Sequence, residues 1–166
     1  MDPADKKTAL RMIPYGLYVL TAEVGDKVAA ATVNWVTQAS FEPPLVAVGV
    51  KKDSGGHALI KEAGHFALNV LGKGQQSAAF AFFKPAEKKG DSIAGEKVEA
   101  GSTGAPLLLS APASVECKLV ETVELGDHSI FVGEVVDAKV RTQPEGRADA
   151  ATLLLADLGE KVFYGG

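Results

Sequence analysis

The chain has 166 residues, of which 46% are hydrophobic and 23% are charged, a composition typical of a globular domain. At this length the simplest expectation is a single domain over residues 1–166. The net charge is −4 and no long basic run occurs. Nucleic acid and anionic membrane surfaces are therefore not expected as principal partners.

The N-terminal residues and the one cysteine bear on the compartment. No stretch approaches the roughly 18 consecutive apolar residues of a membrane span, and the polar residues 1–7 lack the apolar core of a signal peptide. We therefore expect no membrane insertion and a cytoplasmic location. Cys117 cannot form an intramolecular disulfide, and its alternating surroundings favour a buried small hydrophobic residue over a reactive thiol.

The first half of the chain alternates apolar runs with turn residues. The expected elements are a short helix over 5–13, strands over 16–22, 27–34, 45–50 and 66–71, and helices over 57–63 and 75–83. Gly25 and Asp26 predict a hairpin turn between the first two strands. Residues 34–40 are polar and predict a loop, which a double proline separates from the following strand.

The second half begins with a long segment, residues 84–106, that is charged, glycine-rich and poor in large apolar groups. It predicts an irregular excursion with a lid as its candidate role. Clean alternation over 114–124 and 129–140 predicts a long antiparallel hairpin. A polar loop over 141–149 and short closing elements near 153–155 and 162–164 complete the chain.

Strands dominate this pattern, with about seven strands against two or three short helices. Because strands and helices do not alternate regularly, a doubly wound parallel sheet is disfavoured. A closed antiparallel β-barrel with inserted helices fits better. The common nucleotide and hydrolase motifs are missing, since Gly72 and Gly74 lack the third glycine of a dinucleotide fingerprint. Nothing in the pattern predicts a metal site.

A cationic, glycine-rich turn precedes the helix at 57–63. Lys51, Lys52 and Ser54, with the backbone amides of residues 55–57, suit a phosphate, because a helix N-terminus offers N–H donors and a positive dipole end. A solvated lysine pair before a capped helix is the competing interpretation. His57 lies in the first helical turn, where a positive charge is disfavoured unless an anion is bound.

The polar stretch between the two strands suits a flat ring with hydrogen-bonding edges. Asn34, Thr37 and Ser40 offer amide and hydroxyl groups, and Trp35 offers an aromatic wall. Trp35 equally suits a core or a subunit interface, and the two hydroxyls equally suit loop stabilisation. His128 follows Asp127 at a hairpin tip, where a turn residue and a ligand contact are both open interpretations.

These segments together resemble the flavin reductase-like family, the FMN-binding split β-barrel proteins that include flavoredoxin-type and two-component monooxygenase reductases. The resemblance covers roughly residues 8 to 140, in the order and spacing of the family. The matching segments are residues 14–21, 31–46, 52–54, 57–60, 66–71, 104–108, 116–119 and 126–136. Gly55 and Gly56 stand where the family pattern has a bulkier pair.

The resemblance implies a mainly β, antiparallel split β-barrel and a homodimer with one FMN per subunit, FAD being the other candidate flavin. By position, Asn34, Trp35, Val36 and Thr37 would line the isoalloxazine ring. Ser40, Lys52, Ser54 and His57 would hold the ribityl phosphate, together with Lys51. Phe83 would cover the pocket, and His128 would lie near the flavin or the incoming nicotinamide as the candidate catalytic residue, relaying a proton.

Two functions follow from this resemblance. The first is an NAD(P)H:flavin oxidoreductase that passes hydride from nicotinamide to flavin N5. The second is a flavoredoxin-type electron-transfer protein that takes electrons from a protein partner. Both use the same flavin site, so the sequence does not choose between them. A monooxygenase or another redox protein is the candidate partner, and the sequence leaves the choice of NADH or NADPH open.

Overall fold

The computed structural model describes residues 1–166 and is built mainly from antiparallel strands. The α-helices are α1 (Pro3–Arg11), α2 (Gly55–Ala63) and α3 (Gln76–Ala81), with 3-10 helices η1 (Asp149–Ala151) and η2 (Leu155–Leu158). The strands are β1 (Tyr18–Val24), β2 (Lys27–Val33), β3 (Val36–Ser40), β4 (Leu45–Lys51), β5 (His65–Val70), β6 (Lys88–Lys89), β7 (Ser92–Ile93), β8 (Glu96–Ala100), β9 (Pro106–Leu108), β10 (Ala113–Val123) and β11 (His128–Val140). None of the helices is long and apolar enough to cross a membrane.

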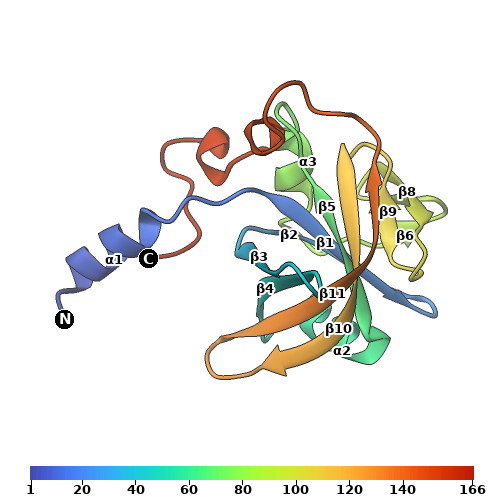
Figure 1. Cartoon of the computed structure of the whole chain (residues 1–166), viewed down its shortest axis with the longest axis horizontal. Coiled ribbons are helices and arrows are strands. Elements are labelled where there is room, and N and C mark those ends of the chain that lie inside the picture. The colour runs from blue at the N-terminus through green and yellow to red at the C-terminus, as the bar shows by residue number, and fades with distance from the viewer.

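Seven strands form the main sheet in the order β2-β1-β5-β10-β11-β4-β3, and all neighbours are antiparallel. The two edge strands, β2 and β3, are consecutive in the chain and are joined only by Asn34 and Trp35. The sheet must therefore curl until its edges approach each other, which gives a barrel split at this junction (Figure 1). The mainly β, antiparallel fold predicted from the sequence is confirmed. The single domain stays a prediction.

Two apolar clusters hold the barrel. One packs Phe66, Leu68 and Phe131 of the main sheet against Ile60 of α2. The other joins β1 to α3, to the smaller sheet and to residues near η2, with Leu17, Phe82, Leu108 and Leu153 at its centre. Cys117 is fully buried in the first cluster, and burial raises the pKa of its thiol to about 12, so its interpretation as a small hydrophobic core residue is confirmed.

Two local predictions were wrong. The polar residues 34–40 are not all loop, because Val36–Ser40 forms β3 and pairs with β4 along the edge of the sheet. Residues 84–106 are not irregular, because β6 to β9 form a separate antiparallel sheet there. These five strands are short, and all but β9 carry polar side chains, so their partners are set by tertiary packing rather than by alternation. The buried side chains of Ile93 and Val98 anchor the small sheet.

The chain ends outside the barrel. α1 has no buried residue and projects away from the barrel, and the C-terminal end lies against it (Figure 1). Residues 160–166, called here the closing segment, have no helix or strand. Arg11 fixes this segment to α1, because its Nε donates to the carbonyl of Gly165 at 3.2 Å and its guanidinium lies 4.2 Å from the centre of the Phe163 ring.

Candidate functional site

A cavity of about 250 Å³ opens where the barrel is split, between β1, β2 and β4. Its wall is mostly apolar, with a smaller number of polar groups. The polar and aromatic lining residues are Thr21, Thr32, Asn34, Lys51, Ser54, Phe82, Phe83, His128 and Tyr164. An apolar slot with few polar groups is the usual form of a site for a flat organic ligand.

A wider groove of about 800 Å³ adjoins this cavity at the start of α2. The two hollows share walls that come from β2, α2 and the segment after α3. The shared residues are Ala29, Ala31, Ser54, Gly56, Phe82 and Phe83. A ligand with a ring in the first hollow can therefore extend toward the helix N-terminus in the second.

The N-terminus of α2 offers backbone donors. Ser54 caps the helix: its Oγ accepts a hydrogen bond from the amide of His57 at 3.3 Å and donates one to the carbonyl of Lys51 at 2.7 Å. The Ser54 hydroxyl proton is therefore already used within the chain. The amides of Gly55 and Gly56, in the first helical turn, have no intrahelical acceptor. These two N–H groups are free hydrogen-bond donors at the groove, of the kind that suits an anion.

Only one of the two lysines faces the cavity. Lys51, at the end of β4, lines it and also lies 3.6 Å from the carboxylate of Asp53. The amide of Lys52 donates to the carbonyl of Asp127 at 3.0 Å, which ties the β4–α2 turn to the β10–β11 hairpin. The side chain of Lys52 lines neither hollow.

Asn34 and Trp35 form the link between the two edges of the barrel. The buried Asn34 lines the cavity, and its Nδ2 donates to the carbonyl of Tyr164 at 3.2 Å. The Trp35 ring packs over β4 at Gly49, where an added Cβ would lie 3.1 Å from Trp35 Cε3. The indole Nε1 is buried and has no hydrogen-bond partner. Trp35 is thus a wall behind the cavity rather than part of its lining.

The other predicted residues of this stretch lie away from the cavity. Val36, Thr37 and Ser40 belong to the edge strand β3, where the exposed Thr37 donates from its Oγ1 to the carbonyl of Gln38 at 3.0 Å. The structure does not bring these three residues together with Asn34 and Lys51. Their role in cofactor binding stays a prediction.

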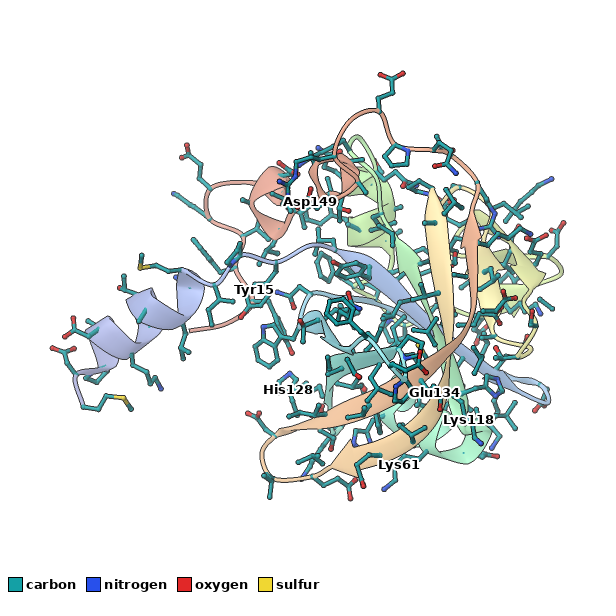
Figure 2. The ribbon with its side chains drawn as sticks, viewed as in Figure 1. Tyr15, Lys61, Lys118, His128, Glu134 and Asp149 are labelled. Atoms are coloured by element: carbon teal, nitrogen blue, oxygen red, sulfur yellow. The ribbon has the colours of Figure 1, made fainter.

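His128 connects the hairpin tip to the closing segment. Its Nδ1 lies 2.8 Å from the Asp127 carboxylate, and its Nε2 lies 2.6 Å from the hydroxyl of Tyr164. Because a carboxylate only accepts, Nδ1 carries a proton, and the Tyr164 hydroxyl can then donate to Nε2. The hydrogen bond from His128 lowers the pKa of Asp127, and burial raises the pKa of Tyr164. Figure 2 shows His128 on the side of the barrel that faces α1.

His57 lies in a different environment from the one its sequence position suggested. It is buried, its Nε2 lies 2.8 Å from the Oγ of Ser129, and its ring packs 5.0 Å from that of Phe131. Burial lowers its pKa, against the opposing effect of the Glu124 carboxylate. His57 lines neither hollow. Its geometry supports the α2–β11 contact, and its assignment to phosphate binding stays a prediction.

Aromatic residues that the sequence did not single out complete the site. Phe82, next to the predicted Phe83, is buried in the wall of the cavity, and Tyr164 closes the side near Trp35. The Trp35 ring centre lies 4.5 Å from that of His128 and 5.2 Å from that of Tyr164. No local motif marks Tyr164, because it lies 36 positions from His128 and meets it only through the path of the closing segment.

The family model described as "Flavin reductase like domain" matches residues 10–160. The reductase component of a 4-nitrophenol monooxygenase from Rhodococcus opacus is 34% identical over 142 residues, which cover 86% of this chain and 75% of that protein. A diflavin flavoprotein from Synechocystis is 35% identical over 138 residues. The match covers 82% of this chain but only 24% of that protein, so the chain spans about a quarter of such relatives.

Solved structures agree with the fold. The flavin reductase component of a bacterial two-component tryptophan halogenase aligns with a TM-score of 0.77 and 28% identity, over 98% of this chain and 96% of that one. A Streptomyces globisporus NADH:FAD oxidoreductase, in complex with NAD and FAD fragments, aligns with a TM-score of 0.73 and 34% identity, over 84% and 85% of the two chains. The resemblance drawn from the sequence is thus confirmed, and the chain belongs to the flavin reductase-like family.

Proposed function

We propose that this protein binds FMN in the cavity at the split of the barrel and acts as an NAD(P)H:flavin oxidoreductase. The single observation that carries this proposal is the continuity of the apolar cavity with the groove at the N-terminus of α2. A ring that needs an apolar slot and a phosphate that needs amide donors find both within one connected space. The names of the reductase relatives support the same activity.

The residues present fit a flavin mononucleotide. The aliphatic wall suits the ring, and the side-chain Oδ1 of Asn34 makes no hydrogen bond within the chain, so it can accept one from a ligand. The amides of Gly55 and Gly56, with Lys51 beside them, would hold the phosphate. Phe83, about half exposed at the mouth of both hollows, would cover the ring.

A bound flavin supplies the ability to accept a hydride and to release electrons, which no side chain of the protein provides. The protein binds and orients the reactants. The aliphatic walls exclude water, the N-terminal dipole of α2 and Lys51 favour negative charge nearby, and His128 holds a proton acceptor, Nε2, at the mouth. We infer that His128 exchanges a proton with the ligand through this nitrogen.

A second candidate is an electron carrier that receives electrons from a protein. It is favoured by the relatives in which this chain matches only one part of a larger protein, such as the high molecular weight rubredoxin of Moorella thermoacetica, 34% identical over 139 residues. In such an arrangement the donor is a protein centre rather than a nicotinamide. A monooxygenase component or another redox protein is the proposed acceptor in the first case. The proposal also includes a homodimer and a cytoplasmic location. FAD remains the alternative flavin, and the choice between NADH and NADPH remains open to measurement.

The test is an anaerobic stopped-flow spectrum of the protein saturated with FMN and mixed with NADH or NADPH. Rapid loss of the oxidised flavin band supports the reductase and identifies the donor. A bound flavin that stays oxidised contradicts it and favours the protein-partner electron carrier. Failure to bind FMN, even in excess, contradicts both candidates.

A further inference from the structure

The closing segment lies across the mouth of the proposed flavin site without forming any regular structure. Tyr164 is one of the residues that line the cavity, although it lies at the other end of the chain from β1 and β2. It also lines a second hollow of about 270 Å³, between the closing segment and the residues that lead into β1. Tyr164 and Leu155 are the two residues that both hollows share, so they stand between them.

Tyr164 is held there by a small number of polar contacts. Its hydroxyl donates to His128 Nε2 at 2.6 Å, and its carbonyl accepts from Asn34 Nδ2 at 3.2 Å. One residue further, the Gly165 carbonyl accepts from Arg11. The Tyr164 side chain nevertheless remains 44% exposed. A segment with few contacts and no backbone ladder opens at low free-energy cost.

Tyr164 makes the contacts with the site that a bound ligand would otherwise make. Tyr164 places an aromatic ring beside Trp35. Its hydroxyl is a hydrogen-bond donor to His128 Nε2, and its carbonyl is an acceptor for Asn34 Nδ2. A nicotinamide group has the same features, because it is a flat ring that carries a carboxamide with N–H donors and a carbonyl acceptor. The tyrosine therefore imitates a ligand within the protein's own chain.

The geometry points to the closing segment as a displaceable plug: Tyr164 occupies the position at which the nicotinamide of the coenzyme meets His128 and Trp35, and it leaves when the coenzyme binds. This inference rests on the proposed function. The competition is intramolecular. The apparent dissociation constant of the coenzyme therefore equals the dissociation constant of the open form divided by the fraction of molecules in which the segment is open. Arg11, outside the cavity, sets that fraction because it fixes the segment to α1.

The variants are Tyr164→Ala, Tyr164→Phe and Arg11→Gln, with Tyr15→Phe as the matched control. Tyr15 is another tyrosine beside the closing segment, but its hydroxyl makes no hydrogen bond and it does not line the flavin cavity. Arg11→Gln loosens the anchor without changing any lining residue of the cavity. None of the three positions is a buried residue of the core, and circular dichroism checks that each variant folds.

The first readout needs no activity. Trp35 is the only tryptophan, so its fluorescence reports whether the Tyr164 ring lies beside it. We expect Tyr164→Ala to shift the emission toward that of a more exposed indole. Saturating NAD⁺, added to the FMN-loaded wild-type protein, should also change the Trp35 emission, because the nicotinamide then replaces the Tyr164 ring beside the indole. A wild-type emission that saturating NAD⁺ leaves unchanged overturns the plug.

The second readout is the dissociation constant of NAD⁺ for the FMN-loaded proteins, which bind it without being reduced by it. For a segment that is open about one-tenth of the time, Tyr164→Ala should bind NAD⁺ about tenfold more tightly. Tyr164→Phe and Arg11→Gln should show smaller gains, and Tyr15→Phe should match the wild type. If Tyr164→Ala binds NAD⁺ no more tightly than the wild type, the plug is overturned. If the same proteins still bind FMN, the proposed flavin site is not affected by that result. Absence of FMN binding in all the proteins overturns the proposed function and the plug together.

Discussion

Two buried asparagines, Asn69 in the interior of the barrel and Asn34 at its split, show how differently this fold treats polar groups. Asn69 donates to the carbonyl of Val19 and to Thr21, and it accepts from the amide of Leu108 and the hydroxyl of Ser114. All four hydrogen bonds of the amide are made within the chain. Such a fully satisfied group fixes the packing of β1, β5, β9 and β10.

At the split of the barrel the same kind of group is left mostly unsatisfied. Asn34 makes one hydrogen bond, the indole N–H of Trp35 makes none, and the first amides of α2 have no acceptor. Buried polar groups in native proteins are nearly always paired, so the free Oδ1 of the buried Asn34, beside the free amides of the unburied first residues of α2, agrees with the ligand site proposed above. The interior network is thus fully satisfied within the chain, whereas the groups at the split are not, which is the contrast that the following predictions test.

Asn69→Ala is the change with the largest expected effect. It leaves the buried amide of Leu108 and the hydroxyl of Ser114 without their acceptor, which should lower the free energy of unfolding by about 3 kcal/mol. Urea unfolding followed by circular dichroism measures this loss.

Asn34→Ala is the matched comparison, since it removes a buried asparagine that makes a single hydrogen bond. It should cost about 1 kcal/mol of stability and should weaken FMN binding, which is measured by flavin fluorescence. Equal stability losses for the two variants would contradict the division into a structural and a binding network.

The second prediction concerns the free amides of α2. Gly55 is the first helical residue, where proline is well tolerated, and Ser54 has the extended backbone, φ −87° and ψ 149°, that a following proline requires. Gly55→Pro therefore removes one N–H donor and keeps the helix. We expect FMN to bind about tenfold more weakly, the value of one hydrogen bond to a charged group.

Riboflavin, which lacks the phosphate, should bind Gly55→Pro and the wild type equally. Gly55→Ala is the control, because it keeps the N–H and its added Cβ meets nothing within 4 Å. If Gly55→Pro weakens riboflavin and FMN alike, the amides do not bind the phosphate and the ligand lies elsewhere in the groove.

Much of this organisation could be predicted from the sequence. Local sequence preferences predicted three features that the structure contains. These are the alternation over β10 and β11, the turn at Gly25 and Asp26, and the apolar run of β4. Lys51, Ser54 and the two glycines that begin α2 are predicted for a local reason too, since a helix start has a sequence signature. In these segments the local signal and the tertiary structure agree.

The remainder depends on contacts between distant parts of the chain. β3 and the small sheet follow no clear alternation, so their pairing is decided by the strands they meet. His57 was placed correctly on α2, but only the register of β11 reveals that its ring faces Ser129 rather than the groove. Tyr164 reaches the site because residues 141–159 carry the chain back over the barrel, which no pattern in residues 160–166 indicates.

A third prediction tests the interior at Cys117. Its Cβ lies against Gly133, where an added Cβ would stand 2.6 Å from Cys117 Cβ and from Phe66 Cζ. Gly133→Ala should therefore destabilise the protein by about 2 kcal/mol, because overpacking forces the neighbours to shift. Thermal unfolding measures this loss. Gly126→Ala, at the exposed hairpin tip with no close neighbour apart from a backbone oxygen at 3.9 Å, is the control and should change little.

The smallest expected effect is a pH dependence that His57 contributes to stability. Because burial lowers its pKa in the folded protein, the unfolded chain binds a proton more readily than the folded one as the pH falls through the ordinary histidine range, about 6.5. Stability is therefore full above that range and decreases on acidification, since the unfolded state then binds more protons. His57→Gln offers Ser129 a similar polar partner and does not titrate, so its melting temperature should fall less than that of the wild type between pH 7.5 and pH 5.5.

The same comparison for His128→Gln separates the two sites, because His128 lies at the mouth and contacts the closing segment rather than the core. An identical pH dependence in His57→Gln and the wild type would show that His57 is not held neutral by its burial, and the contrast between a fully satisfied interior and an open mouth would then lose one of its supports.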